Sequence, residues 1–104
     1  MILLLACVRP APEPAPVEAT EVRYNHVARA HYIRANIHRE EGELNKAADE
    51  YKRAILFDPH AAVLYLELSE VRAELGEADA ARAYLEEAAA LGSEEARALL
   101  DEED

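Results

Sequence analysis

Residues 42–59, GELNKAADEYKRAILFDP, decide the fold of this chain, because residues 76–93, GEADAARAYLEEAAALGS, repeat their pattern. Both stretches open with Gly-Glu, and an offset of 34 residues relates them. The same offset relates further pairs of residues: Ala47 with Ala81, Ala54 with Ala88, Ala35 with Ser69, His31 with Tyr65, and Phe57 with Leu91. So many matches at one offset indicate an internal repeat, which is typical of a protein built from stacked structural units.

Each copy of the repeat has the periodicity of α-helices. In the second half of the first copy, Ala47, Tyr51 and Ala54 recur at the spacing that places side chains on one helical face. Gly42, Pro59 and Gly76 are helix-ending signals, because glycine adopts left-handed backbone angles easily and proline disfavours a helix before it. The pattern predicts an all-α fold. The expected helices span about residues 20–41, 44–57, 62–75, 78–91 and 94–102.

These residues resemble the tetratricopeptide repeat (TPR), whose pattern is W-x₂-L-G-x₂-Y, then A-x₃-F, A and P. The resemblance covers about residues 28–61 and 62–95. The matching residues are Ala35, Ala47, Tyr51, Ala54 and Pro59 in the first copy, and Tyr65, Leu68, Ser69, Ala81, Leu85 and Ala88 in the second. The departures are Arg34, His38 and Arg72. The resemblance implies a short α-solenoid of two helix hairpins, with a long N-terminal helix and a C-terminal capping helix.

Small residues should set the distance between the helices. We expect Ala54 and Ala88 to lie at the close contact between the two helices of each repeat, and Ala81 to allow a similar approach. Ser93 is a good N-cap for the last helix, whose Leu99 and Leu100 can cover the second repeat. About three repeats are needed for a self-sufficient array, so homodimerisation or a partner could supply the missing burial.

Composition excludes several functional classes. The chain has 22 acidic and 11 basic residues and a net charge of −11, which disfavours nucleic acid and anionic membrane surfaces as partners. One cysteine excludes an internal disulfide framework, and three glycines leave no phosphate-binding loop. The histidines lack the i, i+4 spacing of a helical zinc pair. We therefore expect no enzyme, no cofactor and no metal site.

The basic residues lie mainly in the first repeat. Residues 18–61 carry seven bases and eight acids, whereas residues 62–104 carry three bases and thirteen acids. An acidic ligand should therefore approach the first repeat and avoid the second. The resemblance implies that the first helix of each repeat lines the concave, partner-binding surface.

In the first copy, the residues of that concave stripe are Arg29, Tyr32, Asn36 and Arg39, which share one helical face. Arginine and asparagine can bind a carboxylate or a peptide backbone, and tyrosine adds a rigid surface. The corresponding stripe of the second copy, Val63, Leu66, Glu67 and Glu70, lacks basic residues. The first stripe is either a partner-binding surface or an ordinary exposed helix face.

The N-terminus indicates a membrane anchor. Leu4-Leu5-Ala6-Cys7 resembles a bacterial lipobox, which implies lipidation of Cys7 after signal-peptide cleavage. The apolar run before Cys7 is short for a signal peptide, and a start upstream of Met1 would explain this. We expect residues 1–7 to be a signal remnant, residues 8–19 an extended Pro-rich linker, and residues 20–104 the TPR domain. The alternative is a tail with a chance cysteine.

Two functional hypotheses remain. The first is a lipid-anchored protein of the bacterial cell envelope whose repeats bind a protein or peptide. The second is a structural accessory, possible also in the cytoplasm, that oligomerises or caps a larger assembly without a dedicated peptide groove.

Overall fold

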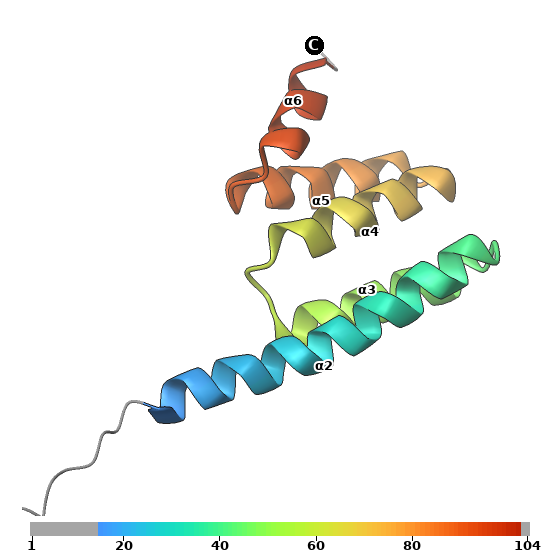
Figure 1. Ribbon diagram of the computed structural model, residues 1–104. Helices are drawn as coiled ribbons and strands as arrows, with labels where there is room; N and C mark the ends of the chain where they lie inside the picture. The colour runs from blue at the N-terminus through green and yellow to red at the C-terminus, as the bar shows by residue number, and fades with distance from the viewer. Residues whose placement is uncertain (1–14, 103–104) are drawn as a thin grey trace, which may run out of the picture.

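The computed structural model describes residues 15–102, with side chains from residue 25 onward (Figure 1). It contains helices α2 (Ala15–Glu40), α3 (Leu44–Phe57), α4 (Ala62–Glu74), α5 (Ala78–Ala90) and α6 (Glu94–Glu102). Within this range there is no strand, and the predicted all-α solenoid of helix hairpins is confirmed. The lipobox and residues 8–14 of the expected linker lie outside the described residues.

Helix α2 begins earlier than the sequence predicts. Its first residue is Ala15 rather than a residue near 20, so residues 15–19 of the expected extended linker are helical. Pro16 is compatible with this start, because the first turn of a helix needs no backbone N–H donor and the φ angle of proline suits it. The linker prediction was therefore wrong for these residues.

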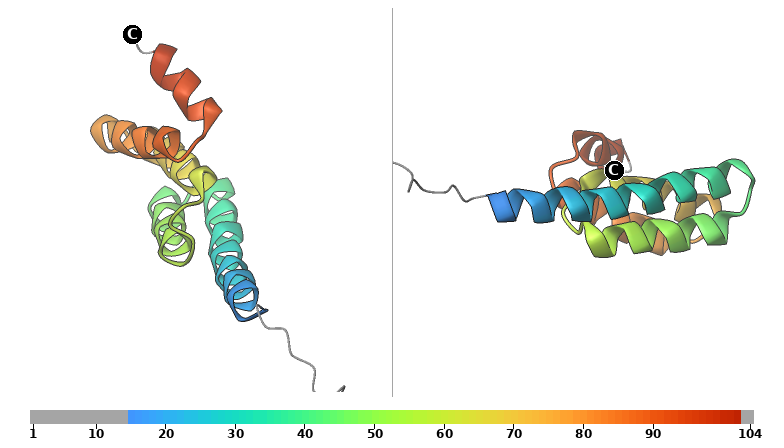
Figure 2. Two further views of the ribbon diagram at one scale, coloured as in Figure 1. Left: turned by 90° about the vertical axis from the view of Figure 1, so that its left-hand side faces the viewer. Right: turned by 60° about the horizontal axis from the view of Figure 1, so that its bottom comes forward.

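The helices form two antiparallel hairpins that stack on each other. Helices α2 and α3 make the first hairpin, α4 and α5 make the second, and α6 crosses the end of the second (Figure 2). The first helices of the two hairpins, α2 and α4, run in the same direction (Figure 1). We call the line along which their facing side chains meet the α2–α4 seam.

Three glycines end helices with the same geometry. Gly42, Gly76 and Gly92 have φ angles of 81°, 82° and 106°, which side chains with a Cβ rarely adopt. After α2, Gly42 N–H donates to the Arg39 carbonyl at 3.0 Å, and Glu43 N–H donates to the His38 carbonyl at 2.8 Å. These two bonds form a Schellman motif, which satisfies carbonyl groups that the helix leaves free. The predicted breaks at Gly42 and Gly76 are confirmed.

Alanines lie where the helices approach most closely. Ala54 of α3 is fully buried and packs with Ala28 of α2 and Leu64 of α4. It therefore lies at the contact within its own repeat, as predicted, and also at the contact with the next repeat. The main cluster of the first hairpin consists of Ala35, Ala47, Ala48, Tyr51, Leu68 and Val71.

Helix α6 covers the second hairpin, as predicted. Ala88 and Ala96 are fully buried in one cluster, against which Leu99 and Leu100 pack. The Ser93 hydroxyl accepts a hydrogen bond from Ala96 N–H at 3.0 Å, which confirms the predicted N-cap. The covering is partial, because Ala81 remains half-buried while its repeat equivalent Ala47 is fully buried.

The half-buried Ala81 lines a groove of about 450 Å³ between α4, α5 and α6. In the first hairpin, the corresponding space is filled by the second half of α4, with Leu68 and Val71. The described part of α6 is nine residues long against thirteen for α4, so it covers the start of this groove and leaves the rest open.

We predict that Ala54→Leu will destabilise the protein by about 1–3 kcal/mol, because the larger side chain would overpack the contact with Ala28 and Leu64. Urea or thermal unfolding followed by circular dichroism would measure this. Ala83→Leu, at an exposed position of α5, is the matched control and should change stability little. Equal stability of the two variants would contradict the packing described.

Candidate functional site

Two residues of the predicted partner-binding stripe lie in one pocket at the beginning of the α2–α4 seam. Arg29 and Tyr32 of α2 line a cavity of about 240 Å³ together with Val63 and Leu64 of α4 and Asp58 of the α3–α4 loop. Asn25, Ala28 and Ala61 complete its walls. Val63 is half exposed, so the pocket offers an apolar surface between charged groups.

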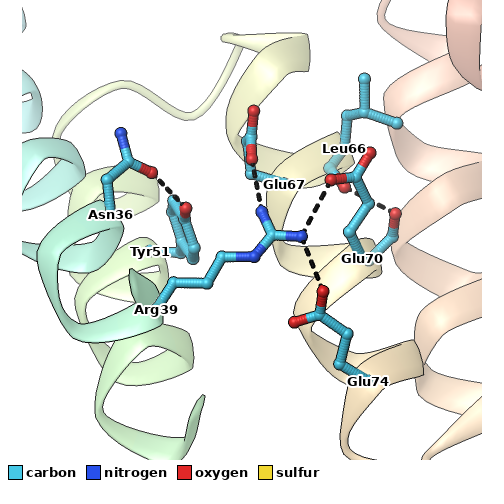
Figure 3. Close-up of polar contacts among 8 residues, drawn as sticks. Asn36, Arg39, Tyr51, Leu66, Glu67, Glu70 and Glu74 are labelled. Atoms are coloured by element: carbon cyan, nitrogen blue, oxygen red, sulfur yellow. Dashed lines mark hydrogen bonds and ion pairs between the residues drawn. The ribbon is translucent and has the colours of Figure 1, made fainter. Parts of the chain in front are cut away.

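The other two residues of the stripe are engaged within the chain. Arg39 crosses the seam from α2, and its guanidinium donates hydrogen bonds to Glu67, Glu70 and Glu74 of α4 (Figure 3). The N–O distances are 2.8, 3.2 and 3.1 Å. Because the three glutamates follow one face of α4, a single cation ties the two hairpins together.

This ion cluster is acidic overall. One guanidinium faces three carboxylates, so two negative charges are left uncompensated. Burial raises the pKa of the Glu67 carboxyl, and the neighbouring Glu70 charge raises it further, against the opposing effect of Arg39. Burial lowers the pKa of the Arg39 guanidinium, but its hydrogen bonds to Glu74 and Glu70 outweigh this and leave the pKa above its ordinary value.

Asn36 has a partner in the first hairpin. The Tyr51 hydroxyl of α3 donates a hydrogen bond to Asn36 Oδ1 (Figure 3). Burial raises the pKa of Tyr51 to about 12, so this tyrosine is protonated at neutral pH. Its ring packs against Tyr32 with a centroid distance of 6.0 Å. Asn36 therefore positions the buried core tyrosine, and the structure separates it from the pocket that Arg29 and Tyr32 line.

His31 is a packing residue, as its place in the repeat predicts. Its Nδ1 lies 2.7 Å from Glu50 Oε1 of α3, and its ring stacks on Phe57 with a centroid distance of 5.9 Å. Burial raises the pKa of the Glu50 carboxyl, but the hydrogen bond and charge interaction with His31 outweigh this and lower it.

The unusual residues His38 and Arg72 have equivalent partners, which are not among the contacts expected from the sequence. His38 Nδ1 lies 2.8 Å from Glu43 Oε1, and Arg72 donates to Glu77 Oε1 at 2.7 Å. Both contacts close the turn between the two helices of a repeat. The sequence contains a signal for these contacts, because the 34-residue offset relates His38 to Arg72 and also relates their partners Glu43 and Glu77.

One group of side chains within the described range has donor atoms close enough for a metal ion. The ligand atoms of His38, Glu41 and Glu43 all lie within 4.8 Å of one another. The group is at the surface of the turn after α2, where the pairing of His38 with Glu43 accounts for its geometry.

None of the described helices combines the length and apolar character that a membrane crossing requires.

We predict that Arg39→Gln will destabilise the protein by about 1–3 kcal/mol at neutral pH, because it leaves partly buried carboxylates without their cation. A raised carboxyl pKa costs stability while the group is ionised and not when it is protonated. The loss relative to the wild type should therefore shrink as the pH falls through the raised pKa of Glu67. Unfolding at several pH values would measure it.

The control for this experiment is Lys46→Gln, which removes an exposed ion pair with Glu43. It should change stability by at most about 0.5 kcal/mol. A loss for Arg39→Gln that is independent of pH would show that the charge cluster is not its cause.

Comparison with known protein families agrees with the two stacked hairpins of the structure. Two tetratricopeptide repeat models match the chain, over residues 28–61 and 62–91, which correspond to the two stacked hairpins. No curated protein matches the sequence. Together the two matches cover more than half of the chain. The chain therefore belongs to the tetratricopeptide repeat family, whose helical repeats form modules for protein–protein interaction.

Proposed function

We propose that the protein is an interaction module that binds a partner segment in the pocket at the beginning of the α2–α4 seam. The observation that carries this proposal is the combination of Arg29, Tyr32 and Val63 around one cavity. Tyr32 and Leu64 form its wall and Val63 its exposed rim, so an apolar side chain of the partner would be buried there. Arg29 has no ion pair within the described residues and would bind a carboxylate of the partner.

The charge of the α2–α4 seam limits which partner segments can extend from the pocket along it. The ion cluster around Arg39 carries surplus negative charge, so an acidic residue would be repelled there and a basic residue attracted. The partner we propose is therefore an extended segment with an apolar anchor and a carboxylate near Arg29, followed by a basic residue near Glu70 and Glu74. Asn36 and Arg39 would support this surface by fixing Tyr51 and α4.

Exposed charge contacts of this kind are weak, at about 0.2–1 kcal/mol each, and are screened by salt. The burial of the apolar anchor should therefore supply much of the affinity. We expect binding to be modest and suited to a partner that is already held close to the protein.

A lipid anchor would provide such proximity. We propose that Cys7 is lipidated and that the protein is held in the bacterial cell envelope, with the residues before α2 separating the anchor from the repeats. The support is the sequence Leu4-Leu5-Ala6-Cys7 and the prolines at positions 10, 12 and 14 that follow it.

To test the pocket, a photoreactive amino acid would be placed at Val63 in the native host. We expect it to form cross-links to a defined partner, because this position borders the apolar anchor site. The matched control is the same substitution at Leu56, which is 76% exposed on α3 and outside the pocket. Identical cross-linking patterns at the two positions, or cross-links only at Leu56, would contradict the proposed site.

To test the anchor, the host would be grown with a clickable fatty acid. The wild-type protein should carry the label and fractionate with membranes, whereas Cys7→Ser should lose both properties. A wild-type protein that contains Cys7 and remains unlabelled would exclude lipidation and leave the interaction module as a protein without an acyl anchor.

A further inference from the structure

A second apolar surface lies on the opposite side of α2 from its packing face. Ile33 and Ile37 are 50% and 49% exposed, although Ala28 and Ala35 on the other side of the same helix are buried. At about 100° per residue, Ile33, Ile37 and the exposed Ala30 form one stripe that points away from α3 and α4. In the repeat architecture, α4 uses its equivalent side to pack on the first hairpin, and α2 has no such partner among the described residues.

On one flank of this stripe, the charges are arranged in a particular order. Arg29 and Glu40 are exposed and lie on the same flank, because eleven residues correspond to about three helical turns. Neither has an ion pair within the part of the chain that the structure describes. The basic group therefore lies before the two isoleucines, and the acidic group lies after them.

We propose that this surface binds a second copy of the chain, with the two α2 helices antiparallel. A two-fold axis midway between Ile33 and Ile37 places each of these residues opposite the other in the partner copy. The same axis places Arg29 within about one residue of the level of Glu40 in the partner copy, on the same flank. Two ion pairs then enclose an apolar contact, and Ala30 allows the helices to approach closely.

The charge order favours this arrangement over the others. A parallel two-fold pair would instead bring opposite flanks of the two α2 helices together and would place Glu40 beside the exposed Glu41 of the partner copy, which is unfavourable. Stacking α2 on the far end of another copy would require α2 to occupy the place of α6, which already covers the second hairpin. The antiparallel pair requires no rearrangement of the fold.

The oligomeric state of the full chain carrying Cys7→Ser tests the proposal. Sedimentation velocity should show a reversible dimer in this protein, and Ile33→Asp with Ile37→Asp should raise the dissociation constant at least about tenfold, since a carboxylate would be buried without a partner. Leu56→Asp, which changes an equally apolar exposed residue on α3, should leave the dimer intact. A monomer at the highest attainable concentration, or equal effects of the two sets of variants, would overturn the proposal.

Orientation is tested by charge and by cross-linking. Glu40→Arg should weaken the dimer, and adding Arg29→Glu in the same chain should restore it. With Cys7 replaced, a chain carrying Ala30→Cys should form a disulfide with a chain carrying Glu40→Cys more readily than with itself. Preferential linking of Ala30→Cys to itself, or no restoration by the charge exchange, would exclude the antiparallel pair.

These outcomes are separate from those for the proposed partner pocket. Ile33, Ile37 and Glu40 do not line that pocket, and Val63 does not belong to the α2 stripe. Arg29 borders both surfaces. The variant with both Glu40→Arg and Arg29→Glu should dimerise but lacks the basic residue of the pocket. It therefore distinguishes the role of Arg29 in the dimer from its role in the pocket.

Discussion

The stacking of this protein depends on side chains that are small enough to let helices meet. Ala35, Ala47, Ala54 and Ala88 are each fully buried. Each contributes little apolar area of its own, but it allows larger neighbours such as Tyr51 and Leu68 to come into contact. The glycines after α2 and α4 serve the same geometry, because they reverse the chain within a few residues and keep the paired helices antiparallel. Close contact and tight reversal together make each repeat a unit on which the next can stack.

The charged residues then determine which parts of the α2–α4 surface stabilise the fold and which remain available for binding. A chain with a net charge of −11 needs its few cations at the places where carboxylates would otherwise repel each other. Arg39 occupies such a place, since it links α2 to three glutamates of α4. This use of Arg39 divides a stripe of four similar helix positions into two parts. Arg39 stabilises the interface between the repeats and Asn36 holds Tyr51 within the first hairpin, whereas Arg29 and Tyr32 remain available at the surface pocket.

The sequence predicts most of the fold because its signals are local. Gly42, Pro59 and Gly76 mark helix ends, and the 34-residue offset gives the repeat. The start of α2 was misplaced because Pro16 is compatible with both a linker and a first helical turn. The partner of Arg39 could not be predicted with the same rules, since it depends on how two hairpins align across the seam. The sequence does contain Glu67, Glu70 and Glu74 at helical spacing, but only the stacked structure shows which cation they face.

The groove left open beside Ala81 has a consequence for the dynamics of the protein. In a repeat protein, each unit is held mainly by its immediate neighbours. The first hairpin has α4 along its groove, whereas the second has only the shorter described part of α6. The free energy of local unfolding should therefore decrease from the first hairpin to the C-terminal helix, and the amide hydrogens of α6 should exchange with solvent before those of α3. Any molecule that fills the groove would contact Leu99 and Glu102 of α6 directly, and its binding would be visible as slower amide exchange in this last helix.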